Sequence, residues 1–168
     1  MPLSMYEASA PRFANMLKNL STILAKAETQ ATERKFDPAV LLGSRLFPDM
    51  FPLLRQVQIA CDNAKGPVAR LAGIEPPRHE DNESSFAELQ ARITKTLDFI
   101  ATVPESRING SEEHEIVLKI GTQELRYSGM QYLCGFALPN FYFHVVTAYD
   151  ILRHNGIDVG KRDYIGQP

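Results

Sequence analysis

Apolar residues recur every three or four positions along four long segments of this chain. The clearest series consists of Phe13, Leu17, Leu20, Leu24, Ala27 and Ala31. Such spacing places the apolar side chains on one face of an α-helix, which is typical of a helix that packs against other helices. The pattern recurs between Pro52 and Gly73, between Ser85 and Pro104, and between Gly129 and His154. We therefore expect these segments to form long helices that share one core.

Residues that favour helix ends bound these segments. Ser4 followed by Glu7 has the spacing of a capping box, and Pro11 predicts a kink near the start of the first helix. Asp37 before Pro38 predicts a short extra helix that ends at residue 43. The residues from 75 to 83 are rich in proline and acidic side chains, which indicates a surface loop.

Between residues 115 and 127 the apolar period falls to two. Ile116, Leu118 and Ile120 alternate with polar residues, a turn follows near Gly121, and the alternation resumes. This pattern predicts a short β-hairpin between the third and fourth long helices. The expected fold class is all-α, an up-down four-helix bundle with one hairpin, forming a single domain over residues 1–168.

Composition limits the classes of partner. The chain has 168 residues, 44% hydrophobic and 23% charged, which is ordinary for one globular domain. Its 18 basic and 20 acidic residues lack the cationic excess that nucleic acid or an anionic membrane surface selects, so we expect neither partner. The N-terminus has no signal-peptide pattern, and Cys61 and Cys134 are isolated, so we expect reduced thiols and a cytoplasmic location.

The fourth helical segment is distinctive because residues 127–149 contain no Asp, Glu, Lys or Arg. Polar residues and Pro139 interrupt this stretch, so we interpret it as a buried helix rather than a membrane span, with Pro139 marking a kink or a restart. It carries Asn140 and His144, and His144 shares the buried stripe of Phe141. A histidine in this position is either hydrogen-bonded across the core or a working imidazole, and both interpretations stand.

The second helix offers Gln58 and Asp62 one turn apart, and the fourth offers Asn140 and His144 at the same spacing. We expect His144, Asn140 and Gln58 to line one ligand pocket between the two helices, with Asp62 as a further candidate in a different register of the second helix. His144 is the only one of the four with the imidazole that zinc or nickel prefers, since amides are weak ligands.

Three stretches carry a resemblance to a known family. The stretches MFPLLRQVQIACDNAKGPVARLAG, PNFYFHVVTAYDILRHNG and GKRDYIG, at residues 50–73, 139–156 and 160–166, resemble an uncharacterised domain-of-unknown-function family. That family is placed in the DinB/YfiT-like superfamily of helical bundles, which includes metal-dependent enzymes. The similarity extends over nearly the whole chain.

The resemblance implies a metal site in the superfamily and the loss of most of its ligands in this chain. Superfamily members commonly carry one histidine on the second long helix and an HxxxH pair on the fourth, and thiol transfer is among their assigned activities. By this resemblance His144 stands at the second position of the pair, Asn140 at the first, and Gln58 near the position on the second helix. The chain would keep one imidazole of the set, so we expect no tightly bound divalent metal such as zinc or nickel.

Three functions follow as hypotheses. The first is a bundle that binds a small molecule in a pocket with a degenerate metal site. The second is an active metal-dependent transferase or hydrolase, similar to the thiol transferases, that uses His144 with further ligands such as Asp62. The third is a homodimeric interaction module without catalysis, in which Tyr142, Phe143 and Val146 lie on the less buried side of the fourth helix and face a partner chain.

Overall fold

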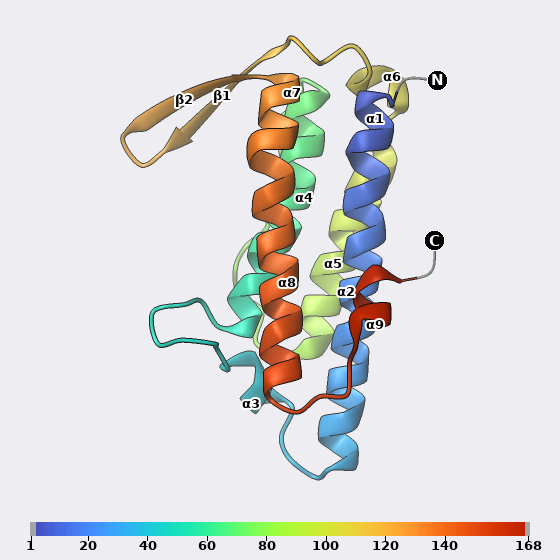
Figure 1. Cartoon of the computed structure of the whole chain (residues 1–168), viewed down its shortest axis with the longest axis vertical. Coiled ribbons are helices and arrows are strands. Elements are labelled where there is room, and N and C mark those ends of the chain that lie inside the picture. Colours follow the sequence, from blue (N-terminus) through green and yellow to red (C-terminus); the bar gives the residue numbers. More distant parts are fainter. Residues whose placement is uncertain (1–2, 167–168) are drawn as a thin grey trace.

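The computed structural model describes residues 3–166 and is mostly helical (Figure 1). The long helices are α2 (Ala10–Glu33), α4 (Leu53–Leu71), α5 (Phe86–Thr102) and α8 (Leu138–His154). The shorter helices are α1 (Met5–Ala8), α3 (Ala39–Leu42), α6 (Glu105–Ile108), α7 (Gly129–Tyr132) and α9 (Lys161–Ile165). Strands β1 (Glu115–Ile120) and β2 (Gln123–Ser128) form a hairpin that projects from one end of the bundle.

The helix starts follow the capping residues of the sequence. The Ser4 hydroxyl accepts a hydrogen bond from the Glu7 amide, and the Glu7 carboxylate accepts one from the Ser4 amide. Pro11 lies in the first turn of α2, and the chain breaks at Ser9 between α1 and α2. The kink expected near the start of the first helix is therefore a break between two helices.

The hairpin confirms the change of period in the sequence. β1 and β2 pair antiparallel, with Ile116 opposite Tyr127 and Leu118 opposite Leu125. Ile116 and Leu118 are buried, whereas the strand residues between them are exposed. These two strands are the only β-structure within residues 3–166, as expected from the one segment whose apolar period is two.

The fourth long segment contains a π-helical turn close to Pro139, where the sequence predicted a kink or a restart. A π-helical turn, η1 (Leu133–Ala137), separates α7 from α8, and Pro139 is the second residue of α8. Proline has no amide proton and crowds the preceding turn, and a widened turn accommodates both effects. After this turn Phe141 is fully buried, and its ring meets that of Phe13 edge to face at 4.9 Å.

Hydrogen bonds between α4 and α8 show the relative direction of these helices. Gln56 bonds to His144, whereas Asn63, later in α4, bonds to Asn140, earlier in α8. The two helices are therefore antiparallel.

The other helix pairs define the topology. The Tyr6 amide bonds to Asn109 and Ser21 bonds to Gln90, so α2 and α5 are antiparallel. The ends of α2 and α8 meet where Arg34 donates to the Gly156 carbonyl at 2.7 Å, so these two helices are parallel. It follows that α4 and α5 run in the same direction (Figure 1). The strictly alternating up-down order expected from the sequence is wrong.

The parallel pair makes the linker between α4 and α5 a structural element. Residues 72–85 have to return along the bundle before α5 can begin, and they lie across α4 and α5. An extended chain advances up to about 3.5 Å per residue against 1.5 Å in a helix, so a linker shorter than α4 suffices. None of the helices in the described part of the chain has the length and apolar character needed to cross a bilayer.

Replacing Gly129 by Ala should destabilise the protein by about 2 kcal/mol or more, because an added Cβ would lie 1.9 Å from the Ser111 carbonyl oxygen. Gly135→Ala is the matched control, since a Cβ there meets nothing within 4 Å and alanine favours a helix. Urea unfolding of both variants measures the effect, and equal stability of the two would contradict this account of the α7 contact.

Candidate functional site

Helix α4 has two polar faces, and most of the candidate residues lie on one or contact the other. The first face carries Gln56 and Asn63 and packs on α8. The second carries Gln58 and Asp62 and faces α5 and the linker. Because residues 56 and 58 lie about 200° apart around a helix, they cannot share a face.

On the first face, His144 is nearly buried and its Nδ1 lies 2.7 Å from Oε1 of Gln56. The amide of Gln56 is oriented by its own donor group, because Nε2 donates to the Phe51 carbonyl at 3.0 Å. Oε1 therefore accepts, and Nδ1 of the neutral imidazole carries the proton. Burial, with a smaller contribution from the Arg55 charge, lowers the pKa of His144 below its ordinary value. At neutral pH Nε2 consequently presents a lone pair.

Asn140 lies one turn before His144 and donates from Nδ2 to Oδ1 of Asn63 at 3.3 Å. Nδ2 of Asn63 is buried and has no hydrogen-bond partner within residues 3–166. The prediction that His144 is buried within reach of another helix is confirmed, and its partner is Gln56.

The second face holds Gln58 and Asp62. Nε2 of Gln58 donates to Glu83 at 2.7 Å, and its Oε1 accepts from Arg55 at 3.0 Å. Asp62 pairs with Lys65 and, at 2.9 Å, with Arg92. The expected convergence of Gln58 with His144 and Asn140 is therefore wrong, because the helix register turns Gln58 away from α8.

Arg92 is the centre of an ionic network on this second face. Its side chain is 1% exposed, and its guanidinium lies 2.9 Å from Asp62, 2.9 Å from Asp81 and 3.0 Å from Glu83. It also donates to the Glu80 carbonyl at 3.1 Å. Arg92 thus ties the linker to α4 and α5. Asp81 and Glu83 form ion pairs within a segment that the sequence indicated only as a surface loop.

The ion pairs control the protonation of the linker acids. Burial works to raise the pKa of Glu83, but hydrogen bonds from Arg92 and Gln58 outweigh burial and lower it. For Asp81 burial is likewise outweighed by Arg55 and Arg92, and the pKa falls. Both carboxylates are ionised at neutral pH.

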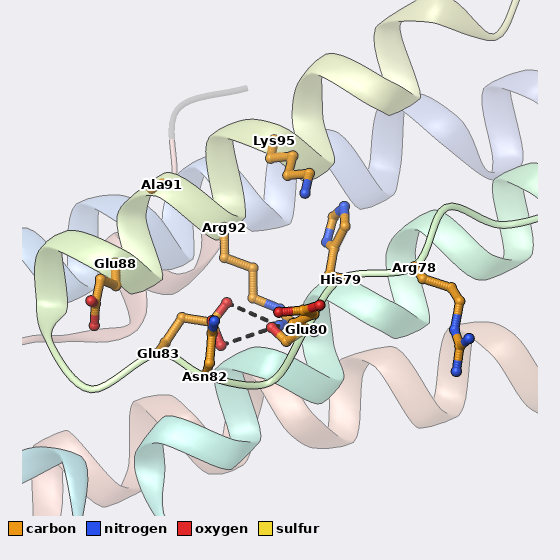
Figure 2. A pocket seen from close by; sticks show the side chains of 9 residues that line it. All are labelled: Arg78, His79, Glu80, Asn82, Glu83, Glu88, Ala91, Arg92 and Lys95. Atoms are coloured by element: carbon orange, nitrogen blue, oxygen red, sulfur yellow. Dashed lines mark hydrogen bonds and ion pairs between the residues drawn. The ribbon is translucent and has the colours of Figure 1, made fainter.

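A cavity of about 520 Å³ adjoins this network, between α5 and the linker (Figure 2). Arg92 and Lys95 line it from α5, and His79 and Glu80 from the linker. The two residues predicted on α8 do not belong to its lining.

Comparison with known proteins identifies the family. A family model, a domain of unknown function (DUF1993), matches residues 5–165. The chain belongs to the DUF1993 family. A DinB family member protein from Shewanella denitrificans, known from a crystal structure, is 43% identical and has a TM-score of 0.88 to this chain. That similarity covers 97% of this DUF1993 chain and 92% of the other. No curated protein matches the chain. The predicted resemblance to an uncharacterised DinB-like family is confirmed.

The thiols of this DUF1993 protein are free. Cys61 is fully buried, and burial raises its pKa to about 12. A thiol that stays protonated at neutral pH is a poor nucleophile, so Cys61 acts as a small core residue.

Several residues of the site were missed from the sequence. Arg92 interrupts the apolar series of α5 between Leu89 and Thr96, and a charged residue in such a series was an available signal. His79 and Glu83 belong to the loop between α4 and α5. The path of this loop depends on the direction in which α5 runs, and the spacing of apolar residues does not determine that direction. Nothing in the sequence distinguished Gln56 from Gln58 as the glutamine that contacts α8.

Replacing Arg92 by Met should lower the free energy of unfolding by about 3 kcal/mol at neutral pH, because Glu83 would stay nearly buried without its cation. The lowered pKa of Glu83 means that its ion pair stabilises the fold above the ordinary value of 4.5 and stops doing so as pH falls. The difference between the wild type and Arg92→Met should therefore be full above pH 4.5 and shrink as the pH falls below that value in urea unfolding.

Arg126→Met is the control for this measurement, since Arg126 pairs with Glu115 and Glu124 on the exposed surface of the hairpin. It should change stability little at any pH. An equal effect of the two arginine substitutions would contradict the central role of Arg92.

Proposed function

We propose that this DUF1993 protein binds a small molecule between α4 and α8, where Nε2 of His144 accepts a hydrogen bond or a proton from the ligand. The observation that carries the proposal is the orientation of the imidazole. Gln56 uses Nδ1–H of His144, and Phe51 orients Gln56, so the basic nitrogen is directed away from these partners. Nε2 of His144 has no hydrogen-bond partner within residues 3–166, so this acceptor is left for a ligand.

The polar neighbours of His144 support binding without a transition metal. Gln56, Asn63 and Asn140 are amides, which are weak ligands for zinc or nickel. Within residues 3–166 no group of three or more His, Cys, Asp or Glu side chains is placed to hold a metal ion. The donor set around His144 does not fit the three-histidine site that the superfamily resemblance implies, and the proposed function uses His144 as an organic base.

His144→Gln tests this function because it keeps a polar side chain of similar size and removes the imidazole. Ring ¹⁵N NMR of the wild type should show Nδ1 protonated and Nε2 unprotonated at pH 7. In a titration with phenol, a small hydroxyl donor, the wild type should show shifts at the His144 ring. The binding should be lost in His144→Gln, while stability changes by less than about 1 kcal/mol.

His154→Gln is the matched control, because His154 is an exposed histidine at the end of the same helix. It should leave the titration unchanged. A ring protonated at Nε2, or phenol binding that survives in His144→Gln, would overturn the proposal. One zinc or nickel ion per purified chain, lost in His144→Ala, would favour the metal-dependent transferase or hydrolase instead.

A second candidate function is homodimerisation, with a second copy of this chain covering the outer face of α8. Phe143 is 56% exposed and Val146 is 36% exposed, one turn apart on this face. An aromatic and a branched apolar side chain side by side in water are typical of an interface core. A two-fold pairing of α8 with itself would bury both residues of each chain.

Light scattering should give about twice the 18.8 kDa mass of one chain for the wild type, and Phe143→Ser should shift the mass towards one chain. Ile120→Ser serves as the control, because Ile120 is similarly exposed, at 50%, on the hairpin. A monomeric wild type at micromolar concentration would remove this candidate.

A further inference from the structure

The cavity between the linker and α5 has two unequal ends. Its α5 side presents Glu88, Ala91 and Lys95 on successive turns, with small Ala91 between the charged residues. Glu88 and Lys95 are separated by about 10 Å along the helix axis. Figure 2 shows His79 and Lys95 together at one end and Glu88 at the other. The lining thus places the Lys95 ammonium and the Glu88 carboxylate at opposite ends.

The ionic network beside this cavity is paired within itself. The cations Arg55, Lys65 and Arg92 pair with the carboxylates Asp62, Asp81 and Glu83. Lys95 takes no part in this set and forms no ion pair within residues 3–166. Lys95 and Arg78 are the lining cations without an ion pair in the described part of the chain, and Figure 2 shows Lys95 as the one beside His79.

His79 places a second donor at the same end. Its Nδ1 is buried and has no hydrogen-bond partner in the described part of the chain. A buried N–H without a partner costs more than a buried lone pair, so the neutral ring carries its proton on Nε2. Burial, and then the charges of Lys65, Lys95 and Arg92, lower the pKa of His79 to about 4. A cationic field at this ring favours an anion beside it.

The acidic groups at the cavity limit the charge of that anion. Glu83 is held by Arg92 and Gln58, and Glu88 accepts from the Ser84 amide at 2.6 Å, at the start of α5. Glu80 has no cationic partner within residues 3–166 and faces the same space. A dianion such as phosphate would meet stronger repulsion from Glu80 than a carboxylate, which carries one charge.

From this geometry we propose that the cavity binds the carboxylate of a small aliphatic monoacid between Nζ of Lys95 and Nε2 of His79, with its alkyl group on Ala91. This site lies on the opposite face of α4 from His144 and does not depend on the function proposed there.

Butyrate is the probe, and the His79 ring is the reporter in an NMR titration. Butyrate should shift the ring signals and raise the pKa of His79, because the bound carboxylate stabilises the imidazolium form. Lys95→Met should weaken butyrate at least tenfold while the urea midpoint stays near that of the wild type, since Lys95 is exposed and outside the ionic network. Arg78→Met is the matched control, because Arg78 lines the cavity but points away from His79 in Figure 2.

The outcomes separate the parts of the proposal. Butyrate binding that survives in Lys95→Met, or that falls equally in Arg78→Met, overturns the assigned contacts. Tighter binding of phosphate, or equal binding of butylammonium, overturns the assignment to a monoacid. A wild-type His79 signal that does not respond to butyrate overturns the site itself. Butyrate binding retained in His144→Gln is expected, and its loss there would show that the two sites are not independent.

Discussion

The side chain of Arg92 is the constraint on which the arrangement of this bundle depends. A guanidinium that is almost completely removed from water has to be surrounded by acceptors, and no single helix supplies enough of them. Asp62 comes from α4, and Asp81 and Glu83 come from the linker. The parallel packing of α4 and α5, the return path of the linker and the cavity beside it are therefore linked through one residue.

The helices and the hairpin could be predicted because their signals are local. Capping by Ser4 and the shortened period around Ile116 act within a few residues, and the structure reproduces both. The direction of α5 is not a local property, since the same apolar spacing packs equally well in either direction. The length of the proline-rich linker was compatible with a return along the bundle, but it did not require one.

The candidate site shows a finer limit of sequence reasoning. His144 was predicted to be buried and paired, because a polar residue in an apolar stripe requires a partner. Gln58 was expected to share a pocket with His144, but the residue that contacts His144 is Gln56. This shift of two residues moves a side chain to the other side of its helix. Asn140 was placed on the same seam, and its contact is Asn63. Resemblance to a family locates a helix more securely than it locates the face of a residue.

The π-helical turn before Pro139 has a consequence for how the molecule can vary. This turn holds one residue more than an α-helical turn, so it offsets the helical phase of α7 from that of α8 by about 100°. The phase of α7 is set by the close contact of Gly129 with Ser111, whereas the phase of α8 is set by Gln56 and Asn63. The rotation of α7 about the helix axis is thus set independently of the rotation of α8. The face that His144 and Asn140 turn towards α4 is therefore not tied to the face that α7 turns towards Ser111, next to the hairpin.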